Sequence, residues 1–478
     1  MRSLLGLRIA SIVGGVLCLA VLPVASQTAG VHAPLAPGQL LEAVVCEADA
    51  TQSYALYLPS SYTPARSWPI VYFFDPGGRG YRPVELYKDI AEKYGFVIAG
   101  SNNSRNFSPS DSSNSMSAIW QDTHLRLALD ERRTYTSGFS GGARVAGSMA
   151  LGCSQCLIGG VIAHGAGYPN SSKSPARDKM PYFLAVGDQD FNWGEVIGIR
   201  RQREEQGLPY RVRVFSGPHQ WAPAAVMEDA LEWVILKGMQ ARSQPADAAF
   251  IDRFFLKMQA EAEDAGKRGD AITELSAYRS LVSDFGGLKD VAEYERKLAA
   301  LKRSADLKTA LKKEQEQIAE QDSLEAEIRP KLQVFATGSL EDPFALHRQL
   351  LQDLRQLKDE ATRAKSEVKH LVAMRAFRGM WAEGIETGQQ EFLARHFDTA
   401  EEYFQLMSSV SEDPWPLLLL AETRTAQGNK KQAIKDLREA IRRGLKSAET
   451  IEKDSNLRAL SSDPEFQKIL RELHATGK

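Results

Sequence analysis

Residues 133–143 read Arg-Thr-Tyr-Thr-Ser-Gly-Phe-Ser-Gly-Gly-Ala, and this stretch decides the fold of the first half of the chain. Its alternation of apolar and polar residues predicts a strand over 134–137, and residues 143–151 have helical potential. Between them lies Gly138-Phe-Ser140-Gly-Gly142. In such a turn the glycines let neighbouring backbone approach closely, and the serine sits above the N-terminus of the helix. The stretch therefore predicts a nucleophile at Ser140, with a purely structural turn as the alternative.

Strand and helix signals alternate on both sides of this turn. Short stretches bounded by turn residues predict further strands at 53–58, 69–74, 95–100, 157–163, 182–186 and 210–215. Helical spacing of apolar residues separates several of them, at 83–94, 115–131 and 222–240. Strands that alternate with helices predict a mostly parallel sheet with helices on both faces.

A serine hydroxyl is a weak nucleophile at neutral pH, so it needs a histidine that accepts its proton. After Ser140, the histidines that precede the helical half are His164 and His219. His219 lies in a loop between the last predicted strand and the last predicted helix, where the base of such a fold belongs. An ordinary loop histidine is the alternative there. No acid intervenes between Ser140 and His164, so an ordinary role is favoured for His164.

The histidine in turn needs a carboxylate that orients it, and the chain order serine, acid, histidine restricts the choice. The strand predicted at 182–186 runs through Gly187 into Asp188-Gln-Asp190. Asp190 lies three residues past Gly187, at the usual distance for an acid that turns toward the histidine, so it is favoured. Asp188 is expected to brace the loop through hydrogen bonds to the backbone.

Two backbone N–H groups should stabilise the negative oxygen that forms during attack. One is expected from Gly141, directly after the nucleophile. The other is expected from the loop Asp75-Pro-Gly-Gly-Arg-Gly80, at Gly78 or its neighbour Arg79. This loop follows a strand at the carboxyl edge of the sheet, which favours a functional role over a flexible turn.

Residues 53–240 resemble the α/β-hydrolase superfamily, and within it the secreted esterases of the feruloyl-esterase and polyhydroxyalkanoate-depolymerase group. The resemblance is carried by Tyr57-Leu-Pro59, Asp75-Pro-Gly-Gly78, residues 133–143, Gly187-Asp-Gln-Asp190 and His219-Gln-Trp221. It implies ester hydrolysis through an acyl-serine intermediate with Ser140, Asp190 and His219 as the triad, and we expect no cofactor. Asp75 departs from the pattern, because such enzymes often have histidine before the oxyanion glycines.

A polar run follows the strand predicted at 95–100. Residues 101–118 contain eight Ser and four Asn. The run should border the active-site edge of the sheet, where its hydroxyl and amide groups would suit a hydroxylated ester. A solvated loop is the favoured alternative.

The N-terminus is typical of a signal peptide over residues 1–26. Arg2 and Arg8 precede an apolar run from Ile9 to Leu22, and small residues suit cleavage near Ser26. An uncleaved anchor is the alternative. No later segment approaches the roughly 18 apolar residues of a membrane span. We therefore expect a secreted or periplasmic protein without a stable membrane span.

Cleavage would leave Cys46, Cys153 and Cys156. An oxidising compartment permits a disulfide, but three thiols cannot all pair within one chain, and the sequence leaves the pairing open. A structural role is favoured over a redox motif for the Cys-x-x-Cys sequence. No grouping of Cys and His has convincing zinc spacing, so no metal site is expected.

The second half of the chain has a different composition. Residues 1–245 hold 22 Lys and Arg and 20 Asp and Glu, whereas residues 246–478 hold 37 and 41. This higher charge density and the loss of strand signals predict a separate all-α domain. The net charge of −2 gives no reason to expect nucleic acid as a partner.

Two similar helix pairs are predicted within residues 381–445. The small, small and large positions of a tetratricopeptide helix pair are matched by Gly388, Ala400 and Phe404, and again by Ala421, Ala433 and Leu437. This resemblance to tetratricopeptide repeats implies a protein or peptide partner in a concave groove. A packing domain that only steadies the hydrolase or a dimer is the alternative.

The predicted organisation has five parts. They are a signal peptide at 1–26, an α/β-hydrolase fold over 30–242, a linker at 243–249, a helical hairpin region over 250–380, and tetratricopeptide-like repeats with a C-terminal cap over 381–478. Because the first half holds nucleophile, acid and base in order, it should bury its own core and complete its own active site. A chain that ends near Ser243 should then hydrolyse small activated esters.

These features together predict an exported serine hydrolase that acts on a small-molecule carboxylic ester. The helical half would serve for partner binding or assembly. A serine peptidase, or a non-catalytic binding protein on a hydrolase scaffold, is the alternative.

Overall fold

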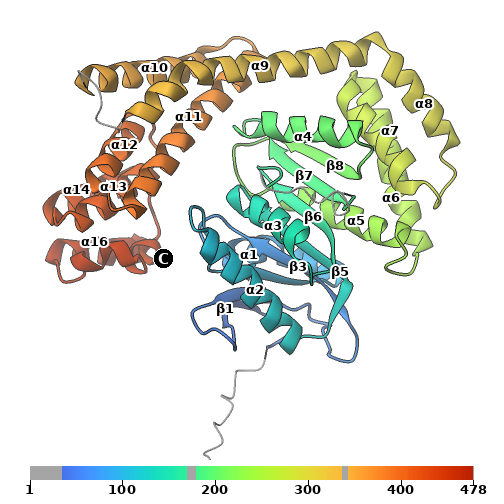
Figure 1. The fold of residues 1–478 in the computed structure, drawn as a ribbon, viewed down its shortest axis with the longest axis horizontal. Helices are drawn as coiled ribbons and strands as arrows, with labels where there is room; N and C mark the ends of the chain where they lie inside the picture. Colours follow the sequence, from blue (N-terminus) through green and yellow to red (C-terminus); the bar gives the residue numbers. More distant parts are fainter. Residues whose placement is uncertain (1–34, 170–178, 336–342, 477–478) are drawn as a thin grey trace, which may run out of the picture. The chain divides into compact units, whose positions relative to one another are not determined.

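An eight-stranded sheet organises the first half of the chain in the computed structural model (Figure 1), which describes residues 35–169, 179–335 and 343–476. The strand order is β1-β2-β4-β3-β5-β6-β7-β8. β2 pairs antiparallel with β1 and β4, and the strands from β4 to β8 are mutually parallel. The strands are β1 (Leu40–Val45), β2 (Ser53–Tyr57), β3 (Trp68–Phe74), β4 (Val97–Ser101), β5 (Leu129–Phe139), β6 (Ile158–His164), β7 (Tyr182–Gly187) and β8 (Tyr210–Phe215).

Alternate side chains of β3 pack on opposite faces of the sheet. Val71 and Phe73 belong to a core shared with α1 (Tyr81–Tyr94) and α5 (Ala224–Gln240). Tyr72 points the other way, and its hydroxyl lies 2.7 Å from that of Thr123 in α2 (Pro109–Arg126). Helices thus cover both faces (Figure 1), and the predicted mostly parallel, two-sided α/β fold is confirmed.

Two elements of this half were not predicted from the sequence. β1 is an edge strand with mostly exposed or half-exposed residues, so it lacks the apolar run of a buried strand. The helix α4 (Trp193–Glu205) has an arginine, Arg203, at one of its buried positions, so its apolar spacing is hard to recognise in the sequence. Arg203 is buried and donates hydrogen bonds to the carbonyl oxygens of Met180 and Pro209 at 2.6 and 2.8 Å.

The described part of the second half is helical. Asp247, Asp270 and Ser304 cap three of its helices by accepting a hydrogen bond from the backbone N–H three residues later. The α-helices are α6 (Ala248–Arg268), α7 (Ala271–Phe285), α8 (Ala292–Arg303), α9 (Ala305–Val334), α10 (Pro343–Arg363), α11 (Glu367–Leu393), α12 (Phe397–Val410), α13 (Trp415–Ala426), α14 (Lys430–Arg442), α15 (Ala448–Glu452) and α16 (Pro464–Thr476).

The core of the sheet does not end at the expected linker, residues 243–249. Phe254 of α6 and Phe285 of α7 are buried in the same apolar cluster as Phe183 of β7 and Trp233 of α5. The indole N–H of Trp233 donates to Asp284 Oδ2 at 2.9 Å. The apolar core therefore continues past the expected linker, because α6 and α7 cover the outer face of α5; that the first half folds by itself stays a prediction. Residues 37–478 form one compact unit.

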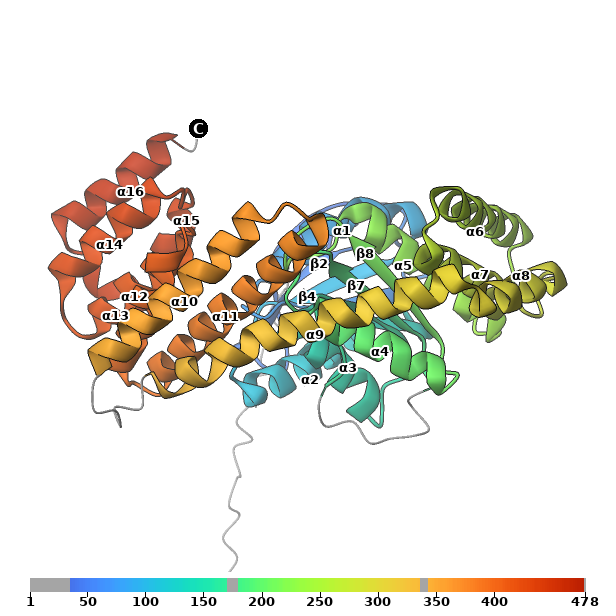
Figure 2. The same ribbon diagram turned by 90° about the horizontal axis from the view of Figure 1, so that it is seen from above.

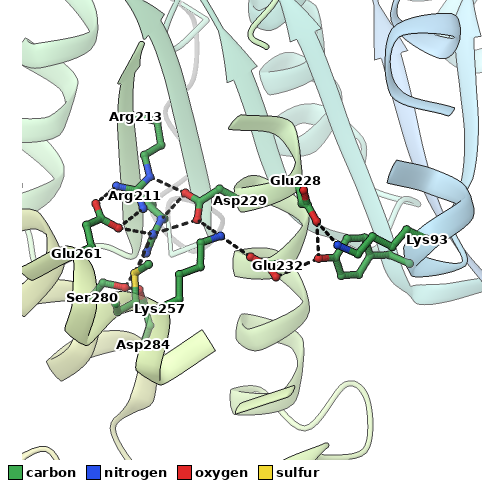
Figure 3. A network of polar contacts seen from close by, with 12 residues as sticks. Lys93, Arg211, Arg213, Glu228, Asp229, Glu232, Lys257, Glu261, Ser280 and Asp284 are labelled. Atoms are coloured by element: carbon green, nitrogen blue, oxygen red, sulfur yellow. Dashed lines mark hydrogen bonds and ion pairs between the residues drawn. The ribbon is translucent and has the colours of Figure 1, made fainter. Parts of the chain in front are cut away.

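A network of charged side chains lies at the same junction (Figure 3). Arg211 and Arg213 of β8 both donate to Asp229 of α5, and Arg213 also pairs with Glu261 of α6. Arg211 donates further to Ser280 of α7 at 2.7 Å. Burial would raise the pKa of Asp229, but the charges of Arg211 and Arg213 outweigh burial and hold this pKa below its ordinary value.

The cysteine pairing that the sequence left open is set in the structure. Cys153 and Cys156 form a disulfide directly after α3 (Gly141–Gly152). Cys46 is a buried free thiol, and burial raises its pKa to about 12.

The predicted signal peptide lies outside the described residues. Within them, no helix is long and apolar enough to cross a membrane.

The predicted helix pairs are present as α11 with α12 and α13 with α14. A Cβ added to Gly388 of α11 would lie 2.6 Å from the ring of Phe404 in α12, so the small residue makes room for the large one. Ala400 is fully buried beside them. The likeness to tetratricopeptide repeats and the partner it implies stay predictions.

Candidate active site

The serine motif forms a sharp turn between β5 and α3. Ser140 has φ 54° and ψ −124°, a backbone conformation that residues with a side chain rarely adopt. A Cβ on Gly138 would lie 2.1 Å from the carbonyl oxygen of Gly142, and one on Gly142 would lie 1.9 Å from that of Phe74. The two glycines are therefore required for the close packing that presents Ser140 at the end of the strand.

The backbone of this turn is tied to the neighbouring strand. The N–H of Ser140 donates to the carbonyl oxygen of His164, the last residue of β6, at 2.8 Å. The strand order and this strand–serine–helix turn decide the fold class. The fold is that of an α/β-hydrolase.

The structure brings the predicted acid and base together. Nδ1 of His219 lies 2.9 Å from both Oδ1 and Oδ2 of Asp190. Asp190 is completely buried, whereas 18% of the His219 side chain is exposed. The imidazole packs against Phe139, the residue before Ser140, with ring centroids 4.5 Å apart. A proton on Nδ1 directed at Asp190 leaves Nε2 as the acceptor, as a general base requires.

The two neighbouring carboxylates have different partners. Oδ1 of Asp188 accepts the backbone N–H of Gly217 at 3.0 Å, which ties the acid loop to the loop that carries His219. Asp190 is the one that reaches the imidazole. These contacts agree with the choice of Asp190 over Asp188, whose catalytic role stays a prediction.

Two backbone N–H groups of the glycine loop already have hydrogen-bond partners. The N–H of Gly78 donates to the carbonyl oxygen of Asp75 at 3.1 Å, and the N–H of Gly77 donates to Asp75 Oδ1 at 2.9 Å. Gly78 could bind an oxyanion only by sharing or leaving its bond. Arg79 is the other donor that the sequence offered beside Gly141, whose N–H belongs to the first turn of α3.

The unexpected Asp75 is a structural brace of this loop. It is fully buried and accepts hydrogen bonds from the side chain of Arg79 at 2.7 Å and from the indole N–H of Trp221 at 3.0 Å. Trp221 lies two residues after His219. Asp75 therefore links the loop of the oxyanion donors to the loop of the base.

The Ser- and Asn-rich run lies against the same site, as expected. The N–H of Asn106 donates to the carbonyl oxygen of Pro76 at 2.9 Å. A Cβ on Gly141 would lie 1.8 Å from Oδ1 of Asn106, so this carboxamide directly contacts the first residue of the nucleophile helix. Sequence reasoning did not single out Asn106 as a site residue, and its signal was only the polar composition of the run.

His164 is a structural residue below the turn. It is completely buried and stacks on Tyr87 with ring centroids 5.9 Å apart. Neither of its ring nitrogens has a hydrogen-bond partner among the described residues. Burial lowers its pKa to about 3, so the ring is neutral near pH 7.

Sequence reasoning missed a second group of residues, which come from the helical half. Arg375 and Arg378 of α11 donate to the carbonyl oxygens of Asp188 and Gln189 at 2.6 and 3.2 Å. Burial raises the pKa of Glu386, also in α11, while the charges of His219 and Arg144 act in the opposite direction. The helical half therefore contacts the acid loop, although the sequence predicted that the first half completes its own active site; that prediction stays open to test.

Across residues 35–169, 179–335 and 343–476, no group of three or more His, Cys, Asp and Glu side chains is arranged to hold a metal ion.

Similar solved structures are matched over about two fifths of this chain. A ferulic acid esterase is 14% identical with a TM-score of 0.32, over 40% of this chain and 94% of the esterase. The fluorophosphonate-binding serine hydrolase F of Staphylococcus aureus is 13% identical with a TM-score of 0.34, over 42% and 99%. An S-formylglutathione hydrolase from Agrobacterium tumefaciens is 13% identical with a TM-score of 0.31, over 40% and 92%. No family model and no curated protein matches the sequence.

Proposed function

We propose that the protein is a serine hydrolase that cleaves small carboxylic esters through an acyl-serine intermediate. The observation that carries the proposal is the hydrogen-bonded pair of His219 and Asp190 beside the strained turn of Ser140. A nucleophile, a base and an acid in this order and fold are the groups that acyl transfer needs.

In the acylation step, Nε2 of His219 takes the proton of the Ser140 hydroxyl while Oγ attacks the ester carbonyl carbon. The carbonyl electron pair moves onto oxygen, where the N–H groups of Gly141 and of Gly78 or Arg79 stabilise the negative charge. This electron pair then re-forms the carbonyl double bond, and the bond from the carbonyl carbon to the alcohol oxygen breaks. His219 gives its proton to the departing alcohol. Asp190 stabilises the imidazolium that exists between the two transfers.

Deacylation repeats these transfers with water as the nucleophile. His219 takes a proton from water, and the resulting hydroxide attacks the acyl carbon. Oγ of Ser140 then leaves and receives the proton from His219, which releases a carboxylic acid and restores the free enzyme.

The proposed place of action is the periplasm or the outside of the cell. The signal-peptide pattern of residues 1–26 supports export. The disulfide between Cys153 and Cys156 agrees with it, because such bonds persist mainly in oxidising compartments.

A substrate panel tests the proposed chemistry. Turnover of p-nitrophenyl esters of increasing acyl length should exceed turnover of aminoacyl p-nitroanilides, and Ser140→Ala should abolish it without changing the circular dichroism spectrum. Preference for the anilides would favour the peptidase alternative. Ester turnover that survives in Ser140→Ala would exclude Ser140 as the nucleophile.

A further inference from the structure

The loop that carries Asp190 is held from outside by the helix α11. Arg375 and Arg378 lie three residues apart, so both side chains leave the same side of the helix. Nε of Arg375 donates to the carbonyl oxygen of Asp188 at 2.6 Å. Nη1 of Arg378 donates to the backbone oxygen of Gln189 at 3.2 Å and to its side-chain oxygen at 3.0 Å.

The helix α9 continues this contact along the loop. The side-chain amide of Gln321, which is buried, donates to the carbonyl oxygen of Phe191 at 3.0 Å. Farther along, Arg200 of α4 donates to Glu314 of α9 at 3.0 Å. Figure 2 shows α9 passing alongside α4. Successive parts of the acid loop and of α4 are therefore attached to the helical half.

Arg375 is fixed more firmly than a surface arginine. Its guanidinium stacks over the ring of Trp193 with 3.8 Å between the guanidinium carbon and the ring centroid, and only 2% of the residue is exposed. Burial lowers its pKa to about 10, although the carboxylates of Asp188 and Asp190 favour the charged form. It therefore remains a cation at neutral pH, and its bond to the carbonyl oxygen of Asp188 is charge-assisted.

The bonds from Arg375, Arg378 and Gln321 go to backbone carbonyl oxygens on both sides of Asp190 along the chain. They therefore fix the course of the loop and, with it, the direction in which the carboxylate points. The ring of Phe191 also packs on His219, with centroids 4.3 Å apart, so a shift of the loop would disturb the imidazole as well.

We propose that Arg375 and Arg378 are positioning residues of the hydrolase, which hold the acid loop so that Asp190 meets His219. The inference rests on the proposed function, and it makes the helical half part of the catalytic unit. A displacement of about 1 Å at a catalytic group can cost 10²-fold in rate, so loss of these bonds should lower kcat rather than raise KM.

The two arginines make a matched pair for a test. In Arg378 a single atom, Nη1, makes both hydrogen bonds, so the ammonium of Arg378→Lys can replace it in part. Arg375 donates through Nε while its planar group stacks on Trp193, which lysine cannot reproduce. Arg424→Met is the control, because Arg424 is a buried arginine of α13 that pairs with Glu401 and Asp436 instead.

Each variant is assayed for kcat and KM with a small activated ester, for thermal unfolding, and for the downfield proton NMR signal of the bond between His219 and Asp190. We expect Arg378→Met to stay folded, to lower kcat by about 30-fold with KM within about twofold, and to lose the downfield signal. Arg378→Lys should restore much of kcat, Arg375→Lys should not, and Arg424→Met should lower only the unfolding temperature.

The proposal is overturned if folded Arg378→Met keeps both kcat and the downfield signal. It is also overturned if Arg424→Met lowers kcat as much, because general destabilisation would then be the cause. If the wild-type protein hydrolyses no ester, the proposed function fails instead. The downfield signal of Arg378→Met, compared with that of the wild type, still decides whether the arginine positions the pair.

Discussion

The helical half meets the sheet-containing half in two places that differ in chemistry. At the first, α6 and α7 cover α5 with aromatic and aliphatic side chains such as Phe254 and Phe285. At the second, α9 and α11 meet the acid loop through polar groups such as Gln321 and Arg378. Burial of apolar surface dominates the stability of a fold, whereas directed hydrogen bonds fix its geometry. The first contact should therefore govern stability and the second catalysis.

Shortened chains should give the largest difference between the effects of the two contacts on stability and on catalysis. A chain that ends at Ser243 loses α6 and α7 and uncovers the outer face of α5. Each large apolar side chain lost from the core is worth about 1.5–3 kcal/mol, and several are lost, which approaches the whole stability of a typical domain, about 5–15 kcal/mol. This chain should be unfolded or aggregated by circular dichroism.

A chain that ends at Lys313 is the matched comparison. It keeps α6, α7, α8 and the start of α9, including Leu307, which packs on α7, but it lacks Gln321, Arg375 and Arg378. It should fold and hydrolyse a small ester about 10²-fold more slowly than the full chain. A folded, fully active chain ending at Ser243 would restore the independent hydrolase domain that the sequence suggested.

The next largest effect is expected on kcat, from a change of Asp190 in the loop that α11 contacts. Asp190→Asn should lower kcat by about 10⁴-fold, because the amide presents the wrong hydrogen-bonding partner to Nδ1 of His219. Asp188→Asn should cost far less, since Asp188 binds the backbone N–H of Gly217. The reverse order of the two kcat values would exchange the roles of the two carboxylates.

A smaller effect is expected at the first contact. Asp229→Asn leaves Arg211 and Arg213 partly uncompensated at the buried junction. Breaking such a buried pair typically costs about 3–5 kcal/mol of unfolding free energy, while kcat at a temperature where the protein is folded should be unchanged. Urea unfolding and ester kinetics on the same preparation check both parts. A change in kcat without a change in stability would contradict the division between the contacts.

The pH dependence of this variant sharpens the prediction. The folded-state pKa of Asp229 is lowered, so its charge contributes stability above its unfolded pKa of about 4, and this contribution is lost as pH falls. The difference in unfolding free energy between the wild type and Asp229→Asn should therefore narrow from pH 6 to pH 3. A constant difference would show that the charge of Asp229 is not what matters.

The sequence was sufficient for the parts of the site that follow from local pattern and chain order. The glycines around Ser140 predict the turn. Asp190 follows β7 and His219 follows β8, the two strands after which acid and base are expected. The contacts of α11 could not be found this way. Arg375 and Asp188 are separated by 187 residues, and an arginine in a charged helix looks like part of a solvated face.

The same limit applies to the expected boundary between the halves, because the core that crosses it could not be read from the sequence. The polar, proline-containing stretch at 243–249 resembles a linker, and residues 241–247 do connect α5 to α6. Composition shows where the chain turns but not which faces are covered afterwards. The buried Trp233 and its partner Asp284 lie on either side of that turn, and only the three-dimensional arrangement joins them.

Covalent labelling of the full chain tests the central claim most directly. A fluorophosphonate reacts with a serine only when base and oxyanion donors are assembled around it. Mass spectrometry of the labelled, digested protein should find one adduct, on the peptide that contains Ser140, and Ser140→Ala should remain unlabelled. A folded wild-type protein that takes up no label, or that carries it on another serine, would contradict the assignment of Ser140 as the nucleophile.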